Sequence, residues 1–193
     1  MLFRSLTGAG GIGKSRLSLQ AAEAAASTYA DGAWLVELAA VAEPTAVGHA
    51  VAGALGVASQ PGKTIEQSLA DALARRHALL VLDNCEHLIE SVAALAQMLL
   101  TRCAKVTLLA TSREALRVQG EQTWPVPALG LDGDAASPAA ALFVDRAHQV
   151  AAGFVPGEHA QAITEICRRL EGIPLAIELA AARVRCKRLG AAS

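Results

Sequence analysis

The stretch that decides the fold is Gly8-Ala9-Gly10-Gly11-Ile12-Gly13-Lys14-Ser15. It follows an apolar run, Leu2–Thr7, and it opens a segment of helical period that begins at Lys14. The spacing G-x-x-x-x-G-K-S between a strand and a helix is typical of a loop that cradles phosphate groups. The glycines let successive backbone N–H groups point inward, and the helix N-terminus adds partial positive charge.

Two residues at the end of this loop have chemical roles of their own. Lys14 is placed to reach the β- and γ-phosphates of a nucleotide, and the Ser15 hydroxyl is placed to occupy a Mg²⁺ coordination position. The predicted nucleotide-binding residues of this segment are Gly8, Gly10, Gly11, Ile12, Gly13, Lys14, Ser15 and Arg16. One alternative is an incidental Gly-rich turn. Another is a dinucleotide site with Glu37 on the ribose, but such a site has no use for Lys14 and Ser15.

Short apolar runs alternate with longer Ala/Leu-rich segments of helical period, which is typical of an α/β domain with a mostly parallel sheet. Strands are predicted at Leu2–Thr7, Ala33–Ala39, Ala78–Leu82, Val106–Ala110 and Thr123–Val126. Helices are predicted at Lys14–Tyr29, Pro44–Leu55, Thr64–Arg76 and His87–Arg102. In the first helix, the spacing predicts a face that packs on the sheet, formed by Leu17, Ala21, Ala24, Ala25 and Thr28. The predicted fold is a three-layer P-loop NTPase with five strands.

The composition changes after this sheet domain. Residues 129–137 are rich in Gly, Asp, Ala and Ser, which favours a linker. Only helix signals follow, at Pro138–Ala152, Gly157–Leu170 and Pro174–Arg188. We therefore expect a nucleotide-binding domain over residues 1–128 and a partial small helical (lid) domain over residues 138–193.

The bulk composition excludes some classes of partner. The chain has 193 residues, a formal net charge of −1 and a pI near 6.5, so no overall field draws it onto nucleic acid or an anionic membrane. No uncharged stretch reaches the roughly 20 apolar residues of a membrane span. The four cysteines, Cys85, Cys103, Cys167 and Cys186, lack zinc-site spacing. We expect reduced thiols in a cytoplasmic protein that does not bind nucleic acid directly.

The third predicted strand ends in an acid. The apolar run Ala78–Leu82 is typical of a buried central strand, and it delivers the Asp83 carboxylate to the carboxyl edge of the sheet. There Asp83 is placed to hold Mg²⁺, through water, opposite Ser15. The alternative is an Asp that caps the following helix.

Several segments, in their order along the chain, resemble one family. They are Leu6–Leu17, Asp31–Leu38, Leu80–Leu88, Leu109–Glu114, Trp124–Pro127, Leu142–Ala147 and Cys167–Ala181. They are similar to the STAND or AP-ATPase class of signal-transducing P-loop ATPases, which is related to NB-ARC domains. The resemblance is greatest to those of bacterial LuxR-type and antibiotic-regulatory-type transcriptional regulators, and it spans nearly the whole chain.

The resemblance implies where further site residues lie. It implies that the strand ending at Ala110 lies between the loop strand and the Asp83 strand, which puts Thr111, Ser112 and Arg113 beside the γ-phosphate. In the family, the Arg of such a tip senses the terminal phosphate, and a guanidinium suits bidentate contact with phosphate. The alternative for Arg113 is an exposed loop charge. In the segment Gly172-Ile173-Pro174, the family's Pro packs near the adenine, while the residues alone indicate a helix end and a new helix start.

One departure from the family concerns hydrolysis. Many relatives have a second acid directly after the metal-binding Asp, but this chain has Asn84, which cannot act as a base. Glu86 is the candidate that polarises the attacking water, and its alternative role is to stabilise the N-terminus of the next helix. The predicted catalytic set is therefore Lys14, Asp83, Glu86 and Arg113, and hydrolysis is expected to be slow.

The functional expectation is an ATP/ADP switch that requires Mg²⁺ and acts as a weak ATPase. The alternatives are a nucleotide-binding module without hydrolysis, and a P-loop kinase or ATPase that acts on a small substrate. The resemblance implies a larger regulator with a winged helix, helical repeats and a DNA-binding domain outside this chain. Self-association that depends on nucleotide also remains open.

Overall fold

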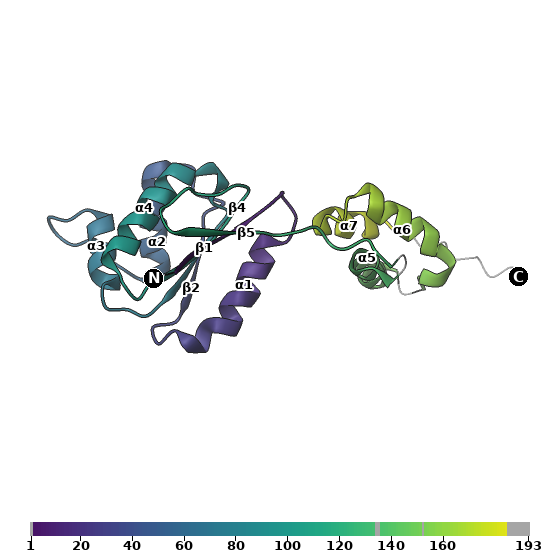
Figure 1. The fold of residues 1–193 in the computed structure, drawn as a ribbon, viewed down its shortest axis with the longest axis horizontal. Helices are drawn as coiled ribbons and strands as arrows, with labels where there is room; N and C mark the ends of the chain where they lie inside the picture. Colours follow the sequence, from purple (N-terminus) through teal and green to yellow (C-terminus); the bar gives the residue numbers. More distant parts are fainter. Residues whose placement is uncertain (1, 134–135, 152, 185–193) are drawn as a thin grey trace, which may run out of the picture. The chain divides into compact units, whose positions relative to one another are not determined.

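The computed structural model describes residues 2–133, 136–151 and 153–184. The chain divides into two compact units (Figure 1). The first contains Met1–Gly10 and Lys14–Val126, and the second contains Pro127–Ser193 together with the loop residues Gly11–Gly13. All five strands belong to the first unit.

The five predicted strands are present and form one parallel sheet. They are β1 Leu2–Thr7, β2 Ala33–Glu37, β3 Leu79–Asp83, β4 Thr107–Ser112 and β5 Glu121–Pro125. Their order is β2-β3-β4-β1-β5, and every neighbouring pair is parallel. β4 therefore lies between β1 and β3, as the resemblance implied, and the expectation of an α/β fold with a five-stranded sheet is confirmed.

Parallel pairing brings the carboxyl ends of β1, β3 and β4 to one edge of the sheet. Thr7, the last residue of β1, pairs with Ser112 of β4, while Leu82 of β3 pairs with Ala110 of β4. β3 includes Asp83, one residue beyond the predicted end of the strand. The loop after Thr7 and the Asp83 carboxylate thus lie at the same edge, on the two strands that flank β4.

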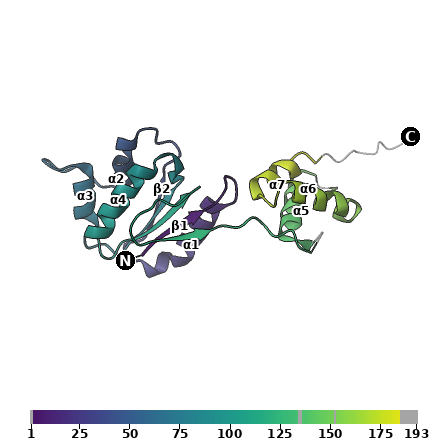
Figure 2. The same cartoon turned by 45° about the horizontal axis from the view of Figure 1, so that its top comes forward.

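Side chains of β3 alternate between two apolar layers, as the strand period requires. Leu80 and Leu82 belong to the main core, which they form with helices α2 Val47–Leu55, α3 Ile65–Leu73 and α4 Ile89–Arg102. Leu79 and Val81 belong to a smaller cluster with Ala22 of α1 Lys14–Ala25. Figure 2 shows α1 on one face of the sheet and the other three helices on the opposite face. Both faces are covered, which explains why β3 reads as a continuous apolar run.

The predicted packing face of α1 is wrong. None of its five members is buried, namely Leu17, Ala21, Ala24, Ala25 and Thr28. The buried residues of α1 are Lys14, Ser18 and Ala22, which recur every four positions. Because α1 begins at Lys14 and that side chain turns back into the loop, the residues four and eight positions later face the sheet. Both are small, which permits close packing of the helix on the strands.

Helix ends in the first unit have local causes that shorten the predicted helices. The Thr64 hydroxyl accepts a hydrogen bond from the Gln67 amide (3.3 Å), and the Gln67 side chain accepts one from the Thr64 amide (3.0 Å), so α3 begins at Ile65. A 3₁₀ turn at Pro44–Ala46 precedes α2. α2 ends where Gly56 adopts the left-handed conformation.

The second unit contains α5 Pro138–Val150, α6 Ala160–Arg169 and α7 Pro174–Ala181. Its core is a separate apolar cluster that includes Phe143, Ile163 and Ile177. The predicted last helix, Pro174–Arg188, ends at Ala181, and its portion from residue 185 onward lies outside the described residues. In the part of the chain that the structure describes, no helix is both long and apolar enough to cross a bilayer.

The turn between α6 and α7 requires a glycine. Gly172 has a φ of +68°, and a Cβ at this position would collide with the carbonyl oxygen of Leu129. The Leu129 amide in turn donates to the Gly172 carbonyl oxygen at 3.0 Å. The segment that follows the sheet is therefore tied to this turn by backbone contact that no larger residue permits.

Candidate phosphate-binding site

The glycine loop connects the last residue of β1 to the first residue of α1. Gly8, Gly11 and Gly13 have φ values of 145°, 75° and 98°, a region that residues with a Cβ rarely adopt. Ile12 points inward and is 7% exposed. The backbone therefore curls at three glycines and is anchored by one apolar side chain, which explains why the motif needs these residue types.

Lys14 is the one charged residue of the loop Gly8–Ser15, and it is nearly buried. Its side chain folds back so that Nζ donates to the carbonyl oxygens of Gly8 (2.9 Å) and Ala9 (3.0 Å), and the residue is only 8% exposed. A lysine ammonium has three donors, so a third remains for an anion. Ser15 and Arg16 are exposed in the first turn of α1. The Ser15 hydroxyl thus lies at the helix start, as the motif predicts.

Asp83 is held by the neighbouring strand. The Thr111 hydroxyl donates to Asp83 Oδ1 at 2.5 Å and accepts from the Asn84 amide at 2.9 Å. Thr111 is 1% exposed, so bulk solvent has little access to this hydroxyl. Asn84 itself has a φ of 65°, which turns the chain sharply after the strand. One buried hydroxyl therefore fixes both the carboxylate and the turn that follows it.

Arg113 and Glu86 form an ion pair at the same edge. Arg113 Nε donates to Glu86 Oε1 at 3.2 Å, with the Arg side chain 68% exposed and the Glu side chain 19% exposed. An Arg113 guanidinium nitrogen lies 3.7 Å from the point where a Cβ on Gly10 would be. Arg113 is thus beside both the loop and Glu86, so it is more than an isolated exposed charge. The sequence predicted each residue separately but not this pair.

The thiol two residues after Asp83 is buried and favours its protonated form. Cys85 is fully buried and its Sγ donates to the Leu82 carbonyl oxygen at 3.3 Å. Burial, followed by the negative charges of Asp83 and Glu86, raises the pKa of the Cys85 thiol to about 12. The cysteines that the structure describes, Cys85, Cys103 and Cys167, are all free and buried, while Cys186 lies outside the described residues.

The donor set fits a phosphate and a hydrated divalent cation. Space is open around Gly13, since nothing lies within 4 Å of where its Cβ would be. In the described residues, no group of three or more His, Cys, Asp or Glu side chains is arranged to hold a metal. A cation held by Ser15 and Asp83 would therefore need phosphate and water oxygens as its remaining ligands, which suits Mg²⁺.

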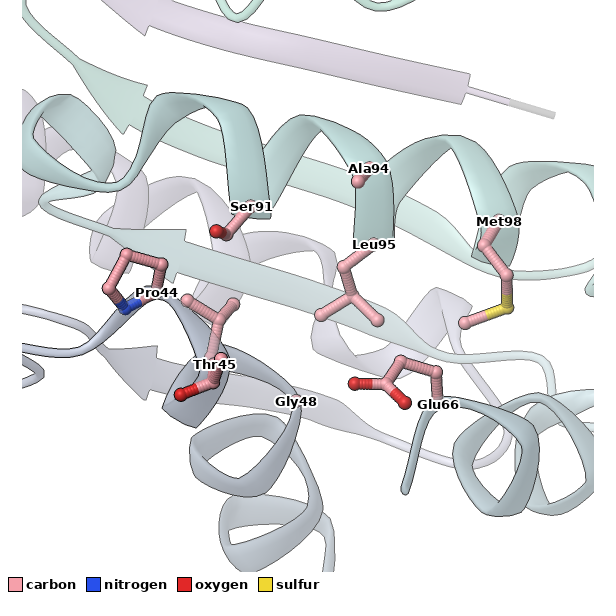
Figure 3. A pocket seen from close by; sticks show the side chains of 9 residues that line it. Pro44, Thr45, Gly48, Glu66, Ser91, Ala94, Leu95 and Met98 are labelled. Carbon is pink, nitrogen blue, oxygen red and sulfur yellow. The ribbon is translucent and has the colours of Figure 1, made fainter. Parts of the chain in front are cut away.

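The chain has two other features, one in each unit. Pro174 is the first residue of α7 in the second unit, and its predicted place near an adenine stays a prediction. A pocket of about 290 Å³ lies among α2, α3 and α4, with Glu66 facing Leu95 and Met98 (Figure 3). None of its lining residues belongs to the glycine loop, and Asp83, Glu86, Thr111 and Arg113 do not line it either. This pocket is therefore separate from the candidate phosphate site.

Solved structures share this fold. A signal transduction ATPase with numerous domains (STAND) from Pyrococcus horikoshii, with a tetratricopeptide repeat sensor, matches 97% of this chain and 28% of its own, with a TM-score of 0.61 and 13% identity. The ORC2 protein of Aeropyrum pernix matches 93% of this chain and 54% of its own, with a TM-score of 0.56 and 12% identity. The chain has the fold of a P-loop ATPase.

The P-loop ATPase fold recurs in CDC6P from Pyrobaculum aerophilum, which matches 92% of this chain and 52% of its own with a TM-score of 0.55 and 18% identity. No protein-family model matches the chain.

Curated proteins are similar at the sequence level. Provisionally named HTH-type transcriptional regulators of Mycobacterium bovis and Mycobacterium tuberculosis are each 48% identical over 182 residues, or 94% of this chain. An uncharacterized protein of Mycobacterium tuberculosis is 45% identical over 180 residues, or 93% of this chain. The chain spans 20% of the length of those regulators and 45% of the uncharacterized protein. This P-loop domain therefore corresponds to one part of longer relatives.

Proposed function

We propose that the chain is the ATP- and ADP-binding switch of a larger transcriptional regulator of the NB-ARC-like STAND class, with slow Mg²⁺-dependent hydrolysis of ATP to ADP and phosphate. The observation that supports this most directly is Lys14, a nearly buried ammonium folded into a glycine loop with one donor free. A nearly buried cation without an acid partner in that loop is stabilised by a bound anion.

The binding roles follow from position in the loop. The backbone N–H groups of Gly8–Gly13 would surround the phosphates, with Lys14 on the β- and γ-phosphates. Ser15 and Asp83 would hold Mg²⁺, and Arg16 would lie beside the nucleotide at the helix start. Bound Mg²⁺ supplies neutralisation of the phosphate charge. Pro174 would contact the adenine.

Hydrolysis would depend on Glu86. Its carboxylate lies beside Arg113 at the loop, whereas the amide of Asn84 cannot accept a proton. A Glu at this position would polarise the attacking water, and Arg113 would stabilise charge on the terminal phosphate. Because Asn84 provides no second acid directly after Asp83, the rate is expected to be low.

The regulatory part of the proposal rests on the relatives. Two 48% identical proteins bear the name HTH-type transcriptional regulator, and this chain spans a fifth of their length. We infer that a LuxR-type or antibiotic-regulatory-type parent contains further domains that respond to the nucleotide state. ATP and ADP can shift such a protein only by contacts made in one state and not in the other.

The first test is chemical identification of the nucleotide. The protein is purified without added nucleotide, denatured, and the released small molecules are separated by ion-exchange chromatography. ATP or ADP at near-stoichiometric amounts is expected from wild-type protein and is expected to be absent from Lys14→Ala. A dinucleotide, or the same nucleotide yield from both proteins, would contradict the proposal.

A binding module without hydrolysis is the second candidate, favoured by the Glu86–Arg113 ion pair and by Asn84. The two candidates differ in phosphate release from ATP with Mg²⁺. Slow release that is lost in both Lys14→Ala and Glu86→Gln supports the weak ATPase. No release above the Lys14→Ala background supports the binding module.

A further inference from the structure

Glu86 has one engaged oxygen and one without a partner. Oε1 accepts from Arg113 Nε at 3.2 Å, while Oε2 is buried and has no hydrogen-bond partner among the described residues. A buried carboxylate oxygen without a donor is costly, because its desolvation is not repaid. The bond from Arg113 is therefore the main electrostatic support of this carboxylate.

The Arg113 guanidinium itself stays hydrated when it leaves Glu86, so the cost of separation falls on the Glu86 carboxylate. The Arg113 side chain is 68% exposed, so water can solvate the guanidinium in any position. The side chain also reaches the loop, with a guanidinium nitrogen 3.7 Å from the Cβ position of Gly10. One cation thus lies within reach of two anionic positions, the Glu86 carboxylate and whatever phosphate the loop binds.

We propose that Arg113 exchanges partners, from Glu86 in the empty and ADP states to the terminal phosphate in the ATP state. This exchange rests on the proposed function. Glu86 then competes with the γ-phosphate for the same guanidinium, and this competition lowers the preference of the site for ATP over ADP. The Glu86 carboxylate becomes free to accept a hydrogen bond from water only when ATP is bound.

The size of the effect follows from exposure. Ion pairs with one exposed partner shift an equilibrium by up to about five-fold. Glu86→Gln keeps the side-chain shape and removes the charge, so it should increase the ratio of ATP to ADP affinity by about two- to five-fold. Removing any nearby negative charge also strengthens the binding of every anion. An equal increase in the ATP and ADP affinities therefore does not support the exchange, and only a change in their ratio does.

The chain offers a matched control. Glu114 is adjacent to Arg113 in sequence but pairs with Arg117, at 3.5 Å. Glu114→Gln removes the same charge close to the site without releasing Arg113. The affinities of a non-hydrolysable β,γ-imido ATP analogue and of ADP, both with Mg²⁺, are measured by calorimetry for wild type, Glu86→Gln, Glu114→Gln, Arg113→Ala and the Glu86→Gln/Arg113→Ala double variant.

The expected result is a higher analogue-to-ADP affinity ratio in Glu86→Gln, no change of the ratio in Glu114→Gln, and no further effect of Glu86→Gln once Arg113 is Ala. An unchanged ratio in Glu86→Gln overturns the exchange, as does an equal increase in the Arg113→Ala background. In either case Lys14-dependent binding by wild type leaves the proposed function standing. If wild type binds neither nucleotide, the proposed function fails and the exchange fails with it.

Discussion

The Thr111 hydroxyl donates a hydrogen bond to Asp83 Oδ1 at 2.5 Å and accepts one from the Asn84 backbone amide at 2.9 Å. Thr111 and Asp83 come from the neighbouring strands β4 and β3 and lie 28 positions apart in sequence. The bond fixes the rotation of a carboxylate at the open edge of the sheet. For a carboxylate that we propose holds Mg²⁺, a hydrogen bond of this kind orients the ligand and determines how well it binds the metal.

Thr111→Val should raise the Mg²⁺ concentration needed for half-maximal nucleotide binding by about ten-fold or more. Loss of an outer-shell hydrogen bond to a metal ligand typically lowers metal affinity by this factor. Thr111→Ser restores the hydroxyl and should bind as wild type does. The measurement is the Mg²⁺ concentration for half-maximal binding of a fluorescent ATP analogue. A purely structural Thr111 would lower the melting temperature of the Val variant without moving that concentration.

Ala22→Leu should destabilise the first unit by about 1–3 kcal/mol, because overpacking a close helix–sheet contact forces side chains from their rotamers. Ala22 is 7% exposed and contacts the cluster of Leu79 and Val81. Ala21→Leu is the control, since Ala21 is exposed on the same helix. Its free energy of unfolding in urea should change by no more than about 0.5 kcal/mol. Equal losses of unfolding free energy in the two variants would contradict the conclusion that Ala22, and not Ala21, faces the sheet.

Gly172→Ala should destabilise the second unit by about 1–3 kcal/mol, since a Cβ there meets the Leu129 carbonyl oxygen and the backbone has a positive φ. Gly157→Ala is the matched control in the same unit. A Cβ at Gly157 has no atom within 4 Å. Thermal unfolding followed by circular dichroism should show a loss only for Gly172→Ala, and a loss of similar size in both variants would exclude the steric explanation.

Stability should fall at alkaline pH through Cys85. Its pKa is about 12 in the folded chain against 9.0 for an ordinary thiol, so the folded state holds its proton while the unfolded state loses it. The stabilising contribution is therefore complete below pH 9.0 and declines as the pH rises towards about 12. The free energy of unfolding in urea, measured between about pH 8 and about pH 11, should fall less steeply with pH in Cys85→Ala than in wild type. An unchanged slope would contradict this role.

The sheet and the loop were predictable because their signals are local. Apolar runs of strand length and the Gly8–Ser15 spacing define them without knowledge of tertiary contacts. The strand order came from the resemblance alone, since period and composition do not say that β4 lies between β1 and β3.

The α1 face was wrong because the helix offers two stripes at helical spacing. The stripe that includes Leu17 is the more apolar one, but the sheet contacts Ser18 and Ala22. The direction of Lys14 decided between them, and that direction depends on the folded loop. The Glu86–Arg113 pair was out of reach for a similar reason, because 27 positions separate its members. Only the pairing of β3 with β4 and the turn at Asn84 bring them together.

Nucleotide binding at the glycine loop is best tested by the affinity of the protein for ATP with Mg²⁺, measured by calorimetry on nucleotide-free wild type, Lys14→Ala and Lys105→Ala. Lys105 lies at the opposite end of the sheet, just before β4, and serves as the control for loss of a positive charge. Saturable one-to-one binding is predicted for wild type and Lys105→Ala, with a loss of about ten-fold or more in Lys14→Ala, as for removal of a charged hydrogen bond to a buried anion. Equal affinities in all three proteins would contradict a phosphate site at this loop.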